Sequence, residues 1–291
     1  MFFVKVNSDR IKRIAELLSP HKNLLEILYR RDPQYIAVQG LLRARKCEET
    51  CILVLLNALV SYQLNMPGEQ YWLNFARHFS ENTGRDLYSL FENFLRTHSS
   101  RMLSWKLSRV KKLLSSELIL ELQRDPFKYC RNTAELARKL ASILKTRDLS
   151  KTVLFAVKMY GYVCDLCGVK PEYIDLKIPL DFRNALIALA SCIVSIKGVN
   201  VAGANIYKYA KLLTSQKYSN LVQSALSELC RELKISCIHL DTFTWLFTGI
   251  IIKSNCNFEK AHSYLKEVLG VNLSRDLILE LTRCWCLSSV S

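Results

Sequence analysis

Apolar residues recur along this chain mostly at helical spacing, whereas the alternation that marks strands is scarce. Ser8, for example, precedes Ile11, Ile14, Leu17 and Leu18, which form a candidate cap and one apolar helical face. The same pattern predicts helices over residues 48–63, 69–80, 86–98, 104–113, 117–123, 133–144, 151–163 and 182–196. No internal repeat of fixed period is visible, which argues against a solenoid. The sequence predicts an all-α fold.

Several polar residues stand directly before predicted helices. Asp32 precedes Pro33, a pairing typical of a helix start. Ser150 precedes residues 151–163, Asp181 precedes residues 182–196, and Asp241 is a further capping candidate before an apolar run. Helix capping alone would account for each of these side chains.

The composition is that of a folded protein. Half of the 291 residues are hydrophobic, which excludes intrinsic disorder. No apolar run reaches the roughly 18 residues that a membrane helix needs, and residues 1–10 show no secretory signal. We therefore expect an intracellular protein, in the cytoplasm or nucleoid, without membrane association.

The charge balance points to an acidic partner. Lys and Arg number 41 against 26 Asp and Glu, a net charge of +15. Residues 101–151 alone hold 13 basic and 5 acidic residues, a net of +8. Such an excess is typical of nucleic-acid binding, although a basic surface tuned for solubility would look the same.

The eleven cysteines carry no clear metal signature. Cys164 and Cys167 form a C-x-x-C pair, but the next cysteine, Cys192, is too far for the usual second pair of a zinc or iron–sulfur site. We expect most of the cysteines to be buried apolar side chains. A disulfide between Cys164 and Cys167 stays possible.

The segment from residue 132 to residue 163 carries the clearest functional pattern. Two helices, 133–144 and 151–163, flank a short polar connection, a helix–hairpin–helix layout suited to gripping a DNA backbone. Lys145, Arg147 and Ser150 are the candidate backbone contacts. Lys151 lies in the first turn of the second helix, where the helix dipole disfavours a cation and so favours the free amine that a lysine nucleophile needs.

Six segments in order along residues 10–250 resemble the archaeal 8-oxoguanine DNA glycosylase family, a divergent branch of the helix–hairpin–helix DNA glycosylases. The segments are 31–35, 56–62, 71–72, 151–158, 178–183 and 239–245. The resemblance implies that Lys151 is the amine nucleophile and Asp181 the essential carboxylate of a bifunctional glycosylase and abasic-site lyase. Lys151 would attack C1′ with help from Asp181 and form an imine, from which β-elimination nicks the strand.

The resemblance also implies a pocket for a base flipped out of the duplex, as enzymes acting on bases need. Hydrogen bonds to the base edge would come from Gln34, Lys158 and Asp241. The flat faces of the base would be framed by Trp72, Phe155 and Trp245. Each of these six residues also has a plain structural interpretation, as a core, capping or surface side chain.

By similarity to the superfamily we expect two helical subdomains with the active site in the cleft between them. Residues 1–45 with 172–291 would carry Asp181, and residues 46–171 the hairpin and Lys151. The chemistry requires no metal or organic cofactor, and no four-cysteine cluster is present. The expected partner is double-stranded DNA containing 8-oxoguanine, bound by a monomer.

Three alternatives stay open at this point. A non-catalytic helical nucleic-acid-binding module would explain the charge and the hairpin equally well. A metal-binding or redox protein could be built on Cys164, Cys167 and the other cysteines. A glycosylase for a different damaged base would share nearly every feature of the sequence.

Overall fold

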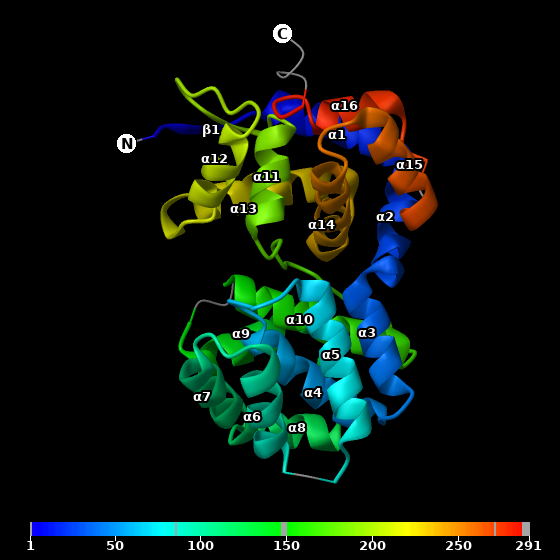
Figure 1. Cartoon of the computed structure of the whole chain (residues 1–291), viewed down its shortest axis with the longest axis vertical. Helices are drawn as coiled ribbons and strands as arrows, with labels where there is room; N and C mark the ends of the chain where they lie inside the picture. Colours follow the sequence, from blue (N-terminus) through cyan, green and yellow to red (C-terminus); the bar gives the residue numbers. More distant parts are fainter. Residues whose placement is uncertain (1, 85, 147–149, 271, 287–291) are drawn as a thin grey trace. The chain divides into compact units, whose positions relative to one another are not determined.

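The computed structural model describes residues 2–84, 86–146, 150–270 and 272–286, and helices dominate it (Figure 1). The predicted all-α class is confirmed. Two compact units are present: unit 1 comprises Met1–Tyr29 and Lys177–Ser291, and unit 2 comprises Arg30–Leu176. The helix Pro33–Leu42 therefore belongs to unit 2, whereas we expected it in the discontinuous subdomain. It packs there against two other helices, Gly68–Glu81 and Lys151–Leu166.

Unit 2 is a bundle around one helix that is buried along all but its first turn. Its elements are α3 (Pro33–Leu42), α4 (Cys47–Val60), α5 (Gly68–Glu81), α6 (Leu87–His98), α7 (Leu103–Leu114), α8 (Glu117–Arg124), α9 (Thr133–Leu144) and α10 (Lys151–Leu166). Every residue of α4 from Thr50 to Val60 is buried, and α10 is its main packing partner. A helix that is apolar on all sides must be surrounded, which fixes α4 at the centre.

Unit 1 joins the start of the chain to its last third. Its elements are β1 (Val4–Val6), α1 (Ser8–Leu18), α2 (Lys22–Leu28), α11 (Phe182–Ala190), β2 (Val194–Ile196), α12 (Asn205–Leu213), α13 (Gln216–Leu233), α14 (Cys237–Lys253), α15 (Phe258–Leu269) and α16 (Arg275–Leu281). Short 3₁₀ turns follow α1 at Ser19–His21 and α2 at Tyr29–Arg31. Helix α11 packs against α12 and α14, and α1 packs against α13, so their apolar faces share one core.

The helix predicted over residues 182–196 is wrong in its second half. Helix α11 ends at Ala190, and Cys192 takes a left-handed conformation with φ 59°. Residues 194–196 then form β2, which pairs antiparallel with β1 so that Val6 lies opposite Val194. This pairing joins segments nearly two hundred residues apart, so local periodicity could not reveal it.

Two predicted caps differ in the structure. Asn7, rather than Ser8, caps α1, its Oδ1 accepting the Arg10 amide at 3.3 Å. Asp241 does not cap a helix, because α14 already begins at Cys237 with Ser236 as its cap. The caps predicted at Asp32, Ser150 and Asp181 are confirmed, each accepting a backbone amide of its helix.

Ten of the eleven cysteines form disulfides, so the expectation that most of them are simply buried apolar side chains is wrong. Unit 2 contains Cys47–Cys167 and Cys130–Cys164, and unit 1 contains Cys192–Cys284, Cys230–Cys237 and Cys256–Cys286. The possible Cys164–Cys167 bond is also wrong, because each sulfur has a distant partner instead. Cys51 is free and buried.

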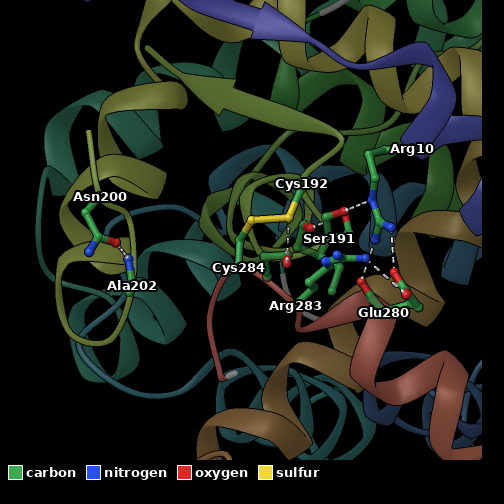
Figure 2. The surroundings of a disulfide bond; sticks show 10 residues. Arg10, Ser191, Cys192, Asn200, Ala202, Glu280, Arg283 and Cys284 are labelled. Carbon is green, nitrogen blue, oxygen red and sulfur yellow. Dashed lines mark hydrogen bonds and ion pairs between the residues drawn. A yellow bond between two sulfur atoms is a disulfide. The ribbon is translucent and has the colours of Figure 1, made fainter. Parts of the chain in front are cut away.

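The Cys192–Cys284 bond lies beside the ion pair between Arg10 of α1 and Glu280 of α16 in unit 1 (Figure 2). The Arg10 guanidinium donates to the Ser191 carbonyl at 3.0 Å and to Glu280 Oε2 at 2.5 Å. Disulfide and ion pair together tie the α11 end to α1 and to the C-terminal segment.

Over the described residues, no single helix has the length and apolar character of a membrane span. Helices α13 and α14 meet that criterion only as a pair, and they are bent by 108° relative to each other.

Candidate active site

Helices α9 and α10 form the predicted helix–hairpin–helix. Lys145 ends α9 in a left-handed conformation (φ 52°), and its amide bonds back to the last turn of the helix. Ser150 starts α10, its Oγ accepting the Val153 amide at 3.4 Å. Lys145 is exposed and Ser150 half-buried, while the predicted contact Arg147 lies outside the described residues. Helix α9 thus ends at an exposed lysine, and α10 begins at a side-chain cap.

Three predicted site residues share one face of α10. Lys151 is its first residue, and Phe155 and Lys158 follow one and two turns later. Their exposure falls steadily along this face: Lys151 is exposed, Phe155 is half-buried and Lys158 is 2% exposed. The amine proposed to react is thus accessible to a large substrate, while the second lysine lies inside the unit.

The Lys158 ammonium is held by a buried carboxylate. Its Nζ lies 3.4 Å from Asp32 Oδ2, and both side chains are almost fully buried. Asp32 Oδ2 also accepts the Tyr162 hydroxyl at 2.8 Å, and Oδ1 accepts the Gln34 amide at 2.9 Å. Burying an ion pair is tolerable only when further hydrogen bonds satisfy it, and Asp32 has them. Asp32 therefore positions both Gln34 and Lys158.

Sequence reasoning treated Asp32 as a cap alone and missed its charged partner. The signal was present in part, because Asp32 lies in one of the six family-like segments. Tyr162 was missed as well: its hydroxyl completes the network, and its ring centroid lies 5.6 Å from the Lys158 ammonium.

Trp72 and Phe155 meet at the edge of an aromatic cluster. Their ring centroids are 6.1 Å apart in an edge-to-face arrangement, and Trp72 packs similarly on Phe75 at 5.3 Å. Trp72 is 1% exposed, so it is part of the core of unit 2. Phe155 is only half-buried and is the ring of this pair with more surface left to meet a ligand.

Asp181 begins α11 in unit 1. Its Oδ1 accepts the Asn184 amide at 2.9 Å, and its carbonyl accepts the Ala185 amide at 3.0 Å. Ile178 and Leu180 just before it are buried and anchor the segment. The carboxylate, half-buried, therefore lies at the positive end of the helix dipole in a fixed orientation.

Asn184 connects Asp181 with Asp241. The Asn184 Nδ2 donates to Asp241 Oδ1 at 2.7 Å, and its Oδ1 accepts the Thr244 hydroxyl. Asn184 is fully buried, and sequence reasoning missed it. A polar side chain inside an otherwise apolar helix was the available signal, since such groups are buried only with partners. Asp241 is thereby oriented by α11 although it belongs to α14.

Trp245 follows Asp241 by one turn of α14. The Arg183 guanidinium lies 3.9 Å from the Trp245 ring centroid, and Arg183 Nη1 donates to the Trp245 carbonyl at 3.2 Å. Gly249, a turn further, leaves room for Arg183, because a Cβ there would come within 3.1 Å of Nη1. Arg183 covers one face of the half-buried indole, so a base could stack only on the other.

The predicted residues therefore fall into two groups. Unit 2 holds the lysines and three further side chains: Gln34, Trp72, Lys151, Phe155 and Lys158. Unit 1 holds both carboxylates and one aromatic ring: Asp181, Asp241 and Trp245. Over the described residues no three His, Cys, Asp or Glu side chains lie together as a metal site would need. Cys164 and Cys167, on which the metal or redox alternative rested, are both in disulfides.

Comparison with known proteins identifies the family. Residues 15–279 match the family model AGOG, described as N-glycosylase/DNA lyase. An N-glycosylase/DNA lyase of Pyrobaculum aerophilum is 27% identical over 267 residues, 90% of this chain and 94% of that protein. Another, of Nanoarchaeum equitans, is 38% identical over 133 residues, 45% of this chain and 58% of that protein.

A solved structure shows the same fold. It is the 8-oxoguanosine complex of the 8-oxoguanine DNA glycosylase Pa-AGOG from Pyrobaculum aerophilum, with a TM-score of 0.66 and 24% identity. The match covers 95% of this chain and 97% of that one. The family that the sequence motifs predicted is confirmed: this chain belongs to the AGOG family of N-glycosylase/DNA lyases.

Proposed function

We propose that the chain removes 8-oxoguanine from double-stranded DNA and then cuts the abasic strand, with Lys151 as nucleophile and Asp181 as the essential carboxylate. The observation that carries the proposal is the arrangement along α10: an accessible lysine at the helix start, then Phe155, then Lys158 locked by Asp32. A helical DNA-binding module would have no need for this buried pair behind an exposed amine.

The chemistry follows from these groups. Breaking the glycosidic bond develops positive charge on the sugar, which the fixed Asp181 carboxylate stabilises. The Lys151 amine forms the bond to C1′ as the base leaves, and ring opening gives a protonated imine. The imine acidifies the C2′ hydrogen. When this proton is abstracted, the 3′ phosphate leaves by β-elimination. These steps require no cofactor.

Base choice rests on the proton at N7 that 8-oxoguanine has and guanine lacks. Gln34 and Asp241 each offer an oxygen that can accept a hydrogen bond. Asp32 and Asn184 orient these two residues through the bonds described above. With guanine in the pocket, a buried acceptor would lack the N7 proton as its partner. The cost of that unpaired acceptor disfavours the undamaged base strongly.

The test is borohydride trapping on a duplex with a single 8-oxoguanine. We expect a covalent adduct with the wild type and with Lys170→Gln, an exposed lysine of the same unit, but none with Lys151→Gln. Asp181→Asn should bind the duplex and excise the base far more slowly. Intact binding without adduct or strand cleavage in the wild type would leave the non-catalytic module. An adduct that forms only on a duplex with another lesion would show that this lesion, and not 8-oxoguanine, is the substrate.

A further inference from the structure

We propose that Trp105 is a platform on which an unpaired nucleobase of bound DNA stacks. The proposal rests on the proposed action on DNA but concerns a surface of unit 2 outside the predicted pocket. Trp105 is 68% exposed, more than any other large hydrophobic residue among the described ones. Among the described residues its indole has no stacking or cation–π partner, and most of the side chain is open to solvent.

The surroundings of Trp105 are basic and contain no acidic residue along the chain. From residue 93 to residue 116 the sequence has no Asp or Glu, whereas it has six Lys and Arg. The exposed surface here called the α7 patch comprises Arg101 and Met102 just before α7 and, on the helix itself, Trp105, Ser108 and Lys112. An aromatic ring among cations is how proteins bind single-stranded nucleic acid, since stacking holds the base and Lys or Arg neutralise the phosphates.

The inward face of α7 holds the α7 patch in place. Lys106 is fully buried and donates to the Ser99 carbonyl at 3.1 Å and to the Ser99 hydroxyl at 2.5 Å. Arg109 lies 4.6 Å from the Tyr62 ring centroid and donates to the Leu59 carbonyl at 3.0 Å. The turn before α7 and the end of α4 are thus fixed against the helix that carries Trp105, so little order is lost when a base binds.

The position of α7 favours DNA as the occupant. Helix α7 packs against α9, the first helix of the helix–hairpin–helix, within the same unit (Figure 1). Met102, just before α7, has φ 56°, a left-handed conformation that is uncommon for a side chain of this size. A strand held by the basic hairpin would meet a second basic surface on the neighbouring helix.

Binding of Trp105→Ala to two DNAs tests the proposal. Base–aromatic stacking predicts that affinity for a 15-nucleotide single strand falls about tenfold, whereas affinity for a fully paired duplex of equal length changes less than about twofold. Trp105→Phe should restore most of the loss. Leu120→Ala, which truncates a 53% exposed residue on α8, is the matched control and should change neither affinity.

Tryptophan fluorescence gives a second readout. The single strand should quench wild-type emission more than Trp105→Phe emission, because a stacked base quenches the indole. Equal losses on both DNAs, or no loss on either, would overturn the proposal. Borohydride trapping separates the platform proposal from the proposed glycosylase function, since these variants keep Lys151. Trapping without quenching would contradict only the stacking on Trp105. Quenching without trapping would contradict only the glycosylase function.

Discussion

The two units hold their buried charges in different ways. In unit 2 the Lys158 ammonium lies against the Asp32 carboxylate, an ion pair with both partners buried. In unit 1 the Asp241 carboxylate receives the neutral amide of Asn184, and Asp181 receives a backbone amide. Loss of one ion-pair partner leaves a charge uncompensated in the interior, whereas loss of a neutral donor removes one orienting bond. The units should therefore respond unequally to comparable mutations.

The largest difference should come from the disulfides. Cys47–Cys167 closes 120 residues of unit 2, and Cys230–Cys237 closes 7 residues of unit 1. Chain entropy predicts that replacing both cysteines by Ser lowers the free energy of unfolding by about 5 kcal/mol in unit 2 and about 2 kcal/mol in unit 1. Guanidinium unfolding under non-reducing conditions measures both. Equal losses would show that loop length does not govern stability here.

Asp32→Asn should cost about 3–5 kcal/mol, because it keeps the shape of the cap but removes the negative charge that faces the buried Lys158 ammonium. Hydrogen exchange should place the lost protection in α3 and α10. Adding Lys158→Met to Asp32→Asn should recover most of the stability. If the double variant is no more stable than Asp32→Asn, the ion pair is not the cause.

Asn184→Ala should cost about 2 kcal/mol in unit 1 and also slow base excision, since it removes the donor that orients Asp241. Thr282→Ala is the matched control: this buried hydroxyl of unit 1 donates to the Ile278 carbonyl of α16 at 2.8 Å, outside the segments that carry Asp181 and Asp241. It should lower stability comparably and leave the excision rate unchanged. A similar slowing in both variants would mean that the rate follows stability alone.

The smallest effect concerns Lys106, whose pKa is lowered by burial to about 8. Between about pH 8 and the ordinary lysine pKa of 10.5 the unfolded chain binds more protons than the folded one, so stability should rise with pH. Burial raises the pKa of the neighbouring Tyr62, so that phenol stays protonated over most of this window. Lys106→Met should show a flatter pH profile in thermal unfolding. Parallel profiles would contradict the assignment.

Local signals made part of this structure predictable. The helix Thr133–Leu144 has the predicted bounds, and the caps at Asp32, Ser150 and Asp181 were read correctly because a capping side chain bonds within three residues of itself. The family followed from six short segments in order. The roles of the site residues stay predictions.

Features made by distant partners were missed. The end of α11, the β1–β2 pairing and four of the five disulfides each depend on residues far along the chain. Asn184 and Arg183 were overlooked for the same reason: their bonds to Asp241 and Trp245 cross from α11 to α14. Asp241 was mistaken for a possible cap, since an apolar run after an acid looks the same in either setting.

The burial of the free thiol Cys51 slows disulfide exchange in the folded chain. Disulfides exchange when a thiolate attacks them, and burial raises the pKa of the Cys51 thiol to about 12. Of the eleven cysteines, all within the described residues, it is the one left unpaired, and its hydrogen bond is to the Pro126 carbonyl rather than to any cation. The folded chain thus lacks an attacking sulfur near neutral pH. Its pairing pattern should persist through prolonged heating until unfolding exposes that thiol.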